Sequence, residues 1–435
     1  MLTILGALIT FGILILVHEF GHFLAARKFG VEIEKFSIGF GPKLISFKHN
    51  NTEFRLSALP LGGYVKMRGE NPDENVYDEA SYRSKSWWQR AVISFAGPFS
   101  NLLFALMVMI LSFAVGRQYT DSLPIIGRIN NQYLSDLAPE DIIIRLNDQE
   151  ISYWSQLYQS TRTEEPNLLV VQRHDQVLNF DLPPLSPEIW MTEVLPRIPA
   201  IIGDVSVGMP AYNAGLKTGD EILSVNGQEV ADWYQMRELI AREGQSEVVL
   251  RIKRGEQIFE KVLPLEDNVL GDNKIIGISQ YQTLIVKEKY SLLESLQYGT
   301  LSTVSFVALN YYAFYKLLTK PSALTSNLGG PVMLLSVSKQ TLEKGLDTIL
   351  TFIAALSLIL MIMNLLPIPI LDGGNIFFCF LEGISGKALP QKLQTVLQNI
   401  GFLLIISLMI FAFANDFSRI FKRNSSLYEQ QVDRE

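Results

Sequence analysis

The sequence predicts a polytopic α-helical membrane protein that carries a large soluble insertion. Of its 435 residues, 48% are hydrophobic, which is too apolar for a purely soluble domain. The charged fraction of 19% is in turn too high for a bundle that lies entirely in the membrane. Four apolar stretches are each long enough to cross a hydrocarbon core of about 30 Å; they cover residues 2–26, 91–115, 348–366 and 397–414.

The first apolar stretch is expected to be a retained span. No positive residue precedes it and no small-residue cleavage site follows it, so it does not match a signal peptide. Eleven lysines and arginines lie between the first two stretches, which the positive-inside rule assigns to the cytoplasm. The N-terminus and the soluble insertion between the second and third spans are therefore expected outside. The net charge of −7, without a long basic block, gives no indication of a nucleic-acid partner.

The first span contains the most informative motif, HExxH. On a helix, His18 and His22 lie one above the other and can offer two imidazole nitrogens to one metal ion, with Glu19 beside them to take a proton from water. The alternative is a histidine pair held by helix-packing hydrogen bonds. Ionisable groups are costly in lipid, so a metal centre is the stronger reading of these residues.

Asp372 is the expected third ligand. It follows the third span, and the predicted topology returns it to the depth of His22; His49 and His174 lie in polar stretches away from any span. Two neutral imidazoles, Asp372 and ionised Glu19 would bring Zn²⁺ to zero net charge, which suits a low-dielectric site. A helix-terminating Asp-Gly turn is the alternative that the pattern leaves open.

The backbone before Asp372 is expected to be unwound. Pro367 and Pro369 remove helix donors there, and irregular backbone at membrane depth is tolerated only in protein or beside a watery cavity. Residues 300–318 are moderately apolar, and a full crossing there would place Asp372 on the wrong side. Their polar residues and tyrosines favour an amphipathic interfacial helix, with a further helix expected over 330–345.

A β-hairpin is expected between the first two spans. Residues 52–58 alternate in polarity, and residues 59–67 then supply a turn and a second strand. The glycine-rich segment 36–42 before them lacks the lysine pattern of a phosphate-binding loop and is expected to be a flexible turn. A free strand edge near a metal centre could pair with an unwound substrate, and Gly62, Gly63 and Tyr64 are the expected contacts. A hairpin that only packs is the alternative.

The soluble insertion contains an internal repeat. Residues 141–154 match residues 220–233 at an offset of 79, which predicts two tandem α+β domains. The second copy carries a fuller signature over 209–220, similar to bacterial PDZ domains, and the first copy lacks part of it. Such a domain could bind a peptide or C-terminus by strand addition, could exclude bulky substrates, or could be a spacer with an empty groove.

Three motifs together resemble the site-2 protease family of intramembrane zinc metalloproteases. They are the HEFGH segment of the first span, Gly97-Pro98 with Asn101 in the second, and the NxxPxPxLDG segment from Asn364 to Gly373. The resemblance covers almost the whole chain. It implies that His18, His22 and Asp372 bind zinc and that Glu19 is the catalytic base. It also implies that Asn364 and Pro367 lie near the substrate helix, and that the hairpin is membrane-associated. Asn375 departs from the pattern, since His is expected there in similar members.

The resemblance implies a function as well. The expected reaction is hydrolysis of a peptide bond in or near the transmembrane helix of a single-pass protein, such as an anti-sigma factor in envelope stress signalling. The expected location is a bacterial inner membrane, with the PDZ-like domains periplasmic and the active site near the cytoplasmic side. A catalytically silent membrane-anchored PDZ scaffold and a metal transporter are the alternatives.

The expected organisation follows from these segments. It comprises a first span (1–26), a cytoplasmic loop with the hairpin (27–90), a second span (91–116), a degenerate PDZ-like domain (117–196), a second PDZ-like domain (197–267), amphipathic connecting helices (268–347), a third span with the LDG motif (348–375), a fourth span (397–415) and a polar tail (416–435).

Overall fold

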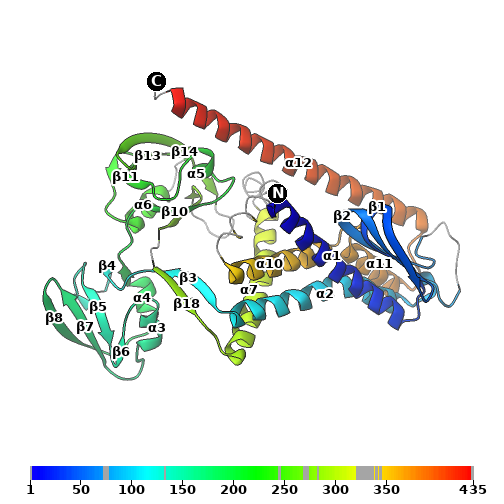
Figure 1. The fold of residues 1–435 in the computed structure, drawn as a ribbon, viewed down its shortest axis with the longest axis horizontal. Helices are drawn as coiled ribbons and strands as arrows, with labels where there is room; N and C mark the ends of the chain where they lie inside the picture. Colours follow the sequence, from blue (N-terminus) through cyan, green and yellow to red (C-terminus); the bar gives the residue numbers. More distant parts are fainter. Residues whose placement is uncertain are drawn as a thin grey trace. The chain divides into compact units, whose positions relative to one another are not determined.

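The computed structural model describes residues 2–71, 78–131, 134–242, 246–267, 274–281, 284–319, 338, 341 and 345–432 (Figure 1). The chain forms two compact units. The first combines residues 1–117, 289–319 and 328–416, and the second is centred on residues 118–288. The helix expected over 330–345 lies almost entirely outside the described residues.

The first unit is mainly helical, and helix α2 (Trp87–Ala114) is its centre. Four other helices of this unit pack against α2; they are α1 (Leu2–Lys28), α7 (Leu292–Thr319), α10 (Leu346–Asn364) and α11 (Asp372–Ser385). Helix α12 (Gln391–Val432) follows α11 and continues through most of the stretch expected as a polar tail.

Four of these helices contain a segment long and apolar enough to cross a membrane, as the sequence predicted. The segments are Leu8–Lys28, Trp87–Ala114, Leu346–Asn364 and Gln391–Phe417. Among the described helices, α7 does not meet this criterion. Its contact with α2 is close, since a Cβ on Gly299 would lie 2.7 Å from Ile110 Cγ1.

In the sequence, a two-stranded sheet follows α1 and precedes α2. Its strand pairing differs from that of the predicted hairpin. Strand β1 (Ile33–His49) pairs with β2 (Thr52–Met67), and the chain reverses at residues 50–51. The register agrees with a turn within residues 59–67 and with a turn that begins in residues 36–42. Residues 53–56 and 63–66 run in opposite directions along residues 35–38, and residues 35–38 and 45–48 run in opposite directions along residues 53–56. The predicted hairpin is wrong in its pairing, because residues 53–56 pair with β1 and not with residues 63–66. Alternation of apolar and polar residues identified extended backbone but did not fix the partner, because pairing is a long-range choice.

Two outer segments of the sheet, residues 45–48 and residues 63–66, have a strand neighbour on one side only among the described residues. Residues 35–38 of β1 pair with residues 53–56 of β2 and also with residues 63–66. Within the described chain, the segment 63–67 thus has its strand partner on one side. Phe36, Val65 and Met67 are buried with Phe23 of α1, which holds this segment against the first helix.

The second unit contains two successive β-rich regions with the same strand order. The first region runs through β4 to β9, with the sheet order β6-β5-β7-β8; the second runs through β10 to β17, with the order β12-β11-β13-β14. A two-stranded sheet of β3 (Arg117–Asp121) and β18 (Leu284–Glu288) joins the two ends of this unit.

The elements of the first region are β4 (Ile126–Ile129), β5 (Ile142–Leu146), β6 (Gln149–Glu150), α3 (Gln156–Ser160), β7 (Asn167–Arg173), β8 (Gln176–Leu182), α4 (Ile189–Thr192) and β9 (Val194–Pro196). Those of the second are β10 (Ile202–Val205), α5 (Pro210–Asn213), β11 (Glu221–Val225), β12 (Gln228–Glu229), α6 (Trp233–Ile240), β13 (Glu247–Arg254), β14 (Gln257–Pro264), β15 (Glu266–Asp267), β16 (Lys274–Ile275) and β17 (Ile278–Gln280). The second core includes Ile276, so this region extends past residue 267.

The two regions repeat their buried polar contacts as well as their strands. Asp141 accepts two hydrogen bonds from the guanidinium of Arg173, both of 2.7 Å. Asp220, 79 residues later, accepts two from Arg254, of 2.6 and 2.7 Å. Each aspartate is almost fully buried and also accepts from a backbone N–H three residues before it. The repeat detected in the sequence therefore corresponds to a repeated three-dimensional arrangement.

Candidate metal centre

Helix α1 presents the three polar residues of the HExxH motif on adjacent turns. The Nε2 atoms of His18 and His22 lie 3.2 Å apart. His22 is buried, and the His18 side chain is only 12% exposed. Glu19 lines the same cavity as the two histidines. The four-residue spacing alone explains why both imidazoles face one point.

Asp372 lies beside the two histidines, although it is about 350 residues later in the chain. The sequence predicted that it would lie at the same membrane depth as His22. Its Oδ2 atom lies 3.1 Å from His18 Nε2, and its Oδ1 atom lies 3.4 Å from His22 Nε2. His49 and His174, by contrast, are exposed. Within the described chain, His18, His22 and Asp372 are the group whose ligand atoms approach closely enough to hold one metal ion.

A folded-back loop brings Asp372 to the histidines. Helix α10 ends at Asn364, and residues 365–371 are not helical, as the two prolines predicted. Helix α11 begins at Asp372 itself. Glycines allow the loop to lie against this helix start, because a Cβ on Gly373 would be 2.3 Å from Leu366 O and one on Gly374 would be 2.3 Å from Ile368 O.

The three side chains fit a tetrahedral zinc ion. Ligand atoms at about 2.0–2.1 Å from a tetrahedral zinc are about 3.3 Å from one another. The two Nε2 atoms are 3.2 Å apart, close to that value. Asp372 approaches His18 at 3.1 Å with Oδ2 and His22 at 3.4 Å with Oδ1, and with one ligand atom from each residue the three atoms lie within 4.8 Å of one another. Three protein ligands leave the fourth position free, which is the pattern of catalytic rather than structural zinc sites.

Hydrogen bonding to His22 supports the same assignment. His22 Nδ1 donates to the backbone carbonyl of Ile93 at 2.8 Å, because a carbonyl oxygen can only accept. In the neutral ring, Nε2 then carries the lone pair and points at the other ligand atoms. A metal cation bound between these atoms would be attracted to this lone pair and to the nearby carboxylate.

Asn101 of α2 provides the equivalent partner for His18. Its side-chain nitrogen lies 3.3 Å from His18 Nδ1, while its Oδ1 is buried without a hydrogen bond in the described part of the chain. The two ends of an amide are assigned from their hydrogen bonds. Rotating the amide by half a turn gives Oδ1 a donor, His18 Nδ1–H, and frees His18 Nε2 to bind metal. The Asn101 backbone carbonyl in turn accepts from Ser357 Oγ of α10 at 2.9 Å.

Two glycines let α1 and α2 approach closely enough for these contacts. A Cβ on Gly97 would lie 2.3 Å from His22 Nε2, and a Cβ on Gly21 would lie 2.2 Å from Ala96 O. No side chain fits at either position without moving a helix or an imidazole. The Gly97-Pro98 element of the second span therefore has a steric role beside the histidines.

The centre opens into a cavity of about 280 Å³. Of the substrate contacts expected from the sequence, Asn364 and Tyr64 line this cavity. Gly63 lies next to the Glu19 side chain, and Gly62 lies against the Phe40 ring with a φ of +147°, which favours glycine. Pro367 is in the exposed part of the loop before Asp372 and does not line the cavity.

Other lining residues had not been singled out as site residues. One of them, Asn375, was named in the sequence analysis as a departure from the family pattern. The others carry no pattern that marks them in the sequence, because their position depends on how β2, α2 and α11 pack. They are Val65, Met67, Glu70, Tyr82, Ile93, Ser94, Ile370 and Leu371.

Comparisons with known proteins found a matching family model and several similar proteins. The model of Peptidase family M50 matches residues 6–408. The regulator of sigma E protease of Haemophilus influenzae is 32% identical, over 95% of this chain and 98% of that protein. The regulator of sigma-E protease RseP of Escherichia coli is 31% identical over the same shares of both chains.

A Pasteurella multocida protein named as a zinc metalloprotease is 34% identical, again over 95% of this chain and 98% of that protein. Among solved structures, the PDZ domain of an SdrC-like protein from Listeria monocytogenes matches with 18% identity and a TM-score of 0.17. It covers 20% of this chain and 90% of that domain.

Proposed function

Because the chain belongs to peptidase family M50 and is a zinc metalloprotease with membrane-spanning helices, we propose that it hydrolyses a peptide bond in or near the transmembrane helix of a single-pass membrane protein. One observation carries the proposal: ligand atoms from α1 and α11 converge within 3.1–3.4 Å, at membrane-spanning helices, with Glu19 in the same cavity. In this proposal His18, His22 and Asp372 hold the zinc ion, and Glu19 is the general base and acid.

Each residue then has a defined part in the reaction. Bound zinc supplies Lewis-acid activation of water and of the scissile carbonyl. The Glu19 carboxylate accepts a proton as water attacks the carbonyl carbon, and it returns that proton to the amine that leaves. Ile93 and Asn101 orient the two imidazoles through their Nδ1 atoms. These contacts keep the Nε2 lone pairs directed at one point.

The outer segment of β2 supports a way of holding the unwound substrate. Residues 63–67 have a strand neighbour on one side, and Tyr64, Val65 and Met67 line the cavity of the metal centre. An extended substrate could add to this edge as a further strand, with Gly62, Gly63 and Tyr64 as contacts and Asn364 and Pro367 on the facing loop. A photo-crosslinking amino acid in place of Tyr64 should capture substrate, whereas one in place of Phe47, at the exposed far end of β1, should not.

The names of the relatives support a particular class of substrate. Two of them are named regulators of sigma E protease. An anti-sigma factor with a single transmembrane helix is therefore the proposed substrate, in a bacterial inner membrane. In the proposed orientation, the active site lies toward the cytoplasm and the second unit lies in the periplasm, consistent with the eleven basic residues between the first two spans.

The second unit supports a recognition or filtering role. Its two regions share a strand order and a buried Asp–Arg pair, so we propose two tandem PDZ-like domains, beginning near residues 117 and 197. The second is the better candidate for binding a peptide or C-terminus. Helix α7 is proposed to lie at the membrane surface, since its length is sufficient for a span but its hydropathy is not.

The test is cleavage of a tagged single-pass protein by the purified chain in detergent. The parent should cleave it, a zinc chelator should stop cleavage, and added zinc should restore it. The Glu19→Gln variant should bind zinc but should not cleave the substrate. A membrane-anchored scaffold without catalytic activity would not depend on Glu19. Equal cleavage by the parent, by the chelated sample and by Glu19→Gln would refute the proposal.

A further inference from the structure

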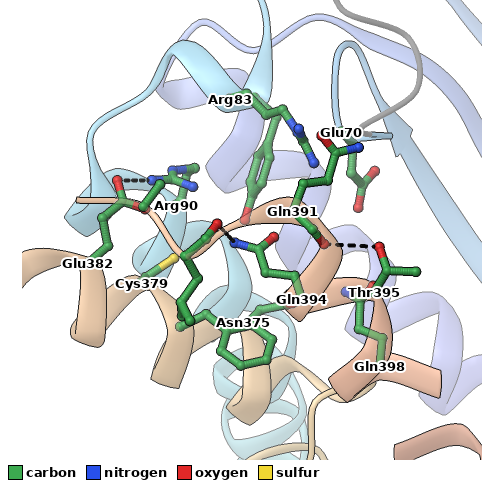
Figure 2. Close-up of a pocket in the computed structure, with 14 residues that line it drawn as sticks. Glu70, Arg83, Arg90, Asn375, Cys379, Glu382, Gln391, Gln394, Thr395 and Gln398 are labelled. Carbon is green, nitrogen blue, oxygen red and sulfur yellow. Dashed lines mark hydrogen bonds and ion pairs between the residues drawn. The ribbon is translucent and has the colours of Figure 1, made fainter. Parts of the chain in front are cut away.

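A second cavity, of about 430 Å³, lies next to the cavity of the metal centre. Figure 2 shows the side chains that line this second cavity. Glu70, Tyr82 and Asn375 line both cavities, so the two spaces share these side chains. The rest of the wall comes from α2, from the second and third turns of α11, and from the first turns of α12. The proposed reaction assigns no role to this space.

The wall of the second cavity is rich in amide side chains. Three glutamines at the start of α12 line it, together with Asn375; they are Gln391, Gln394 and Gln398. Gln394 donates to the backbone carbonyl of Leu389 at 3.2 Å. In the described part of the chain, the side chains of Asn375, Gln391 and Gln398 make no hydrogen bond, so their donors and acceptors remain available.

The charges of the wall nearly cancel. Arg90 of α2 and Glu382 of α11 form an ion pair, which leaves little of either charge for a ligand (Figure 2). The remaining ionisable lining residues include Glu70, Arg83 and Tyr82. Burial raises the pKa of Tyr82 above its usual value, so its hydroxyl stays neutral. A nearly neutral wall with amide groups suits neither a phosphate nor a metal ion, but it suits peptide groups, which are neutral and both donate and accept.

An unwound substrate needs such partners. Hydrolysis requires that several residues around the scissile bond leave the helical conformation, and this exposes their backbone N–H and C=O groups. In a membrane these groups have no bulk water to bond, so the enzyme must provide partners for them. The strand edge of β2 can serve residues at the bond itself. The residues beyond it on one side would enter the neighbouring cavity.

We propose that the cavity formed by α2, α11 and the start of α12 is a substrate subsite, which holds the extended polypeptide on one side of the scissile bond through side-chain amides. This inference rests on the proposed proteolytic function and extends it. Because the amides bond to backbone, the subsite is largely independent of the substrate sequence.

Disulfide crosslinking tests the subsite directly. Cys379 is the only cysteine and lies in the cavity wall, so the Cys379→Ala variant provides a background without thiols. Thr395→Cys then places one thiol in the cavity, and Val396→Cys places one on the next residue, which is 53% exposed and outside the cavity. Both carry Glu19→Gln so that the substrate stays uncut. The probe is the tagged single-pass protein, with single cysteines around a cut site mapped by mass spectrometry and diamide as the oxidant.

The subsite predicts disulfides between the Thr395→Cys variant and two or three substrate positions on one side of the cut, and at least tenfold less product with Val396→Cys. Equal yields from the two variants, or yields spread over all substrate positions, would overturn it. If the parent enzyme cleaves the protein but no crosslink is specific to Thr395→Cys, only the subsite fails. If no cleavage occurs at all, the proposed function fails first.

Kinetics provide a second, independent readout. Each lost hydrogen bond to a neutral partner weakens binding by about 2- to 12-fold, so the double variant Gln391→Ala/Gln398→Ala should raise KM by about tenfold with unchanged zinc content. Lys392→Ala, an exposed change on the same helix outside the cavity, is the matched control. An unchanged KM in the double variant is the result for a cavity that holds only water, and it would overturn the subsite.

Discussion

His18 Nε2 lies 3.1 Å from Asp372 Oδ2, although His18 belongs to the first membrane-spanning helix and Asp372 follows the third. The contact is possible because α10 ends at Asn364 and the loop that follows folds back before α11 begins. One carboxylate thereby completes a site whose other two ligand candidates come from a single helix. The predictions below follow from this contact and from the packing that supports it.

Replacing Glu19 by Gln should remove turnover while leaving zinc in place. The amide keeps the size of the side chain but cannot accept a proton, and general acid–base catalysis contributes about 10²- to 10⁴-fold to rate. Cleavage rates of the purified variants, together with zinc content by mass spectrometry, provide the measurement. Glu260→Gln, an exposed change in β14, is the control. A Glu19→Gln rate within tenfold of the parent would exclude Glu19 as the base.

Replacing Asn101 by Ala should weaken zinc binding about 10- to 100-fold, the usual effect of removing a residue that orients a ligand. Without the amide, the His18 ring has no partner at Nδ1 to fix its orientation. Competition with a chelator of known affinity measures the change. Ser112→Ala is a matched control on the same helix, because the Ser112 hydroxyl is buried and bonds only within α2, to Met109. Equal zinc affinity in both variants would contradict this role of Asn101.

Replacing Gly97 by Ala should abolish zinc binding and cleavage. The added methyl group would lie 2.3 Å from His22 Nε2, so either the imidazole must rotate away or the helices must separate. Gly12→Ala provides the control on α1, since nothing lies within 4 Å of a Cβ there. Both variants should insert in the membrane equally well, so zinc content per purified protein separates them. Full zinc occupancy in Gly97→Ala would show that the helices pack less closely here than described.

Replacing Asp220 by Asn should destabilise the second unit by about 2–3 kcal/mol, because the change removes the charge-assisted pair with the partly buried guanidinium of Arg254. The Asp220 side chain is only 1% exposed. The neighbouring change Glu221→Gln removes an exposed ion pair with Lys253 and should cost less than about 1 kcal/mol. Urea-dependent proteolysis of the whole chain, followed at sites in residues 118–288, measures both. Similar losses in the two variants would refute the distinction.

Local patterns allowed much of the architecture to be predicted. The spacing of His18 and His22 places both imidazoles on one face of α1 whatever surrounds that helix. Apolar length identified the four spans, and Pro367 with Pro369 predicted the interruption after α10. The offset between Asp141 and Asp220 predicted a repeat that recurs in strand order and in buried ion pairs. Each of these inferences depends on interactions within a few residues or on direct self-comparison.

The strand partners and the residues that line the cavity of the metal centre were harder to predict from the sequence. The strand partner of Phe36 was missed, because an alternating pattern identifies a strand but not its neighbour. Met67, Tyr82 and Ser94 line the cavity of the metal centre, yet nothing in their local sequence distinguishes them from other partly buried residues. Their place depends on how β2, the segment before α2, and α2 itself pack around one another.

The amino-acid sequence by itself determined the groups on which the proposed chemistry rests: a carboxylate and two imidazoles placed by the helical period, a distant aspartate after a helix break, and four helices apolar enough to span a membrane. Only the tertiary structure decided that Asp372 comes within 3.4 Å of both histidines and that a second, amide-lined cavity adjoins them. The physical reason is steric. The distances between the ligand atoms depend on close packing at Gly21 and Gly97, where α1 meets α2, and at Gly373, where the preceding loop lies against α11. Packing between segments that are remote in the chain leaves no periodic pattern in the sequence.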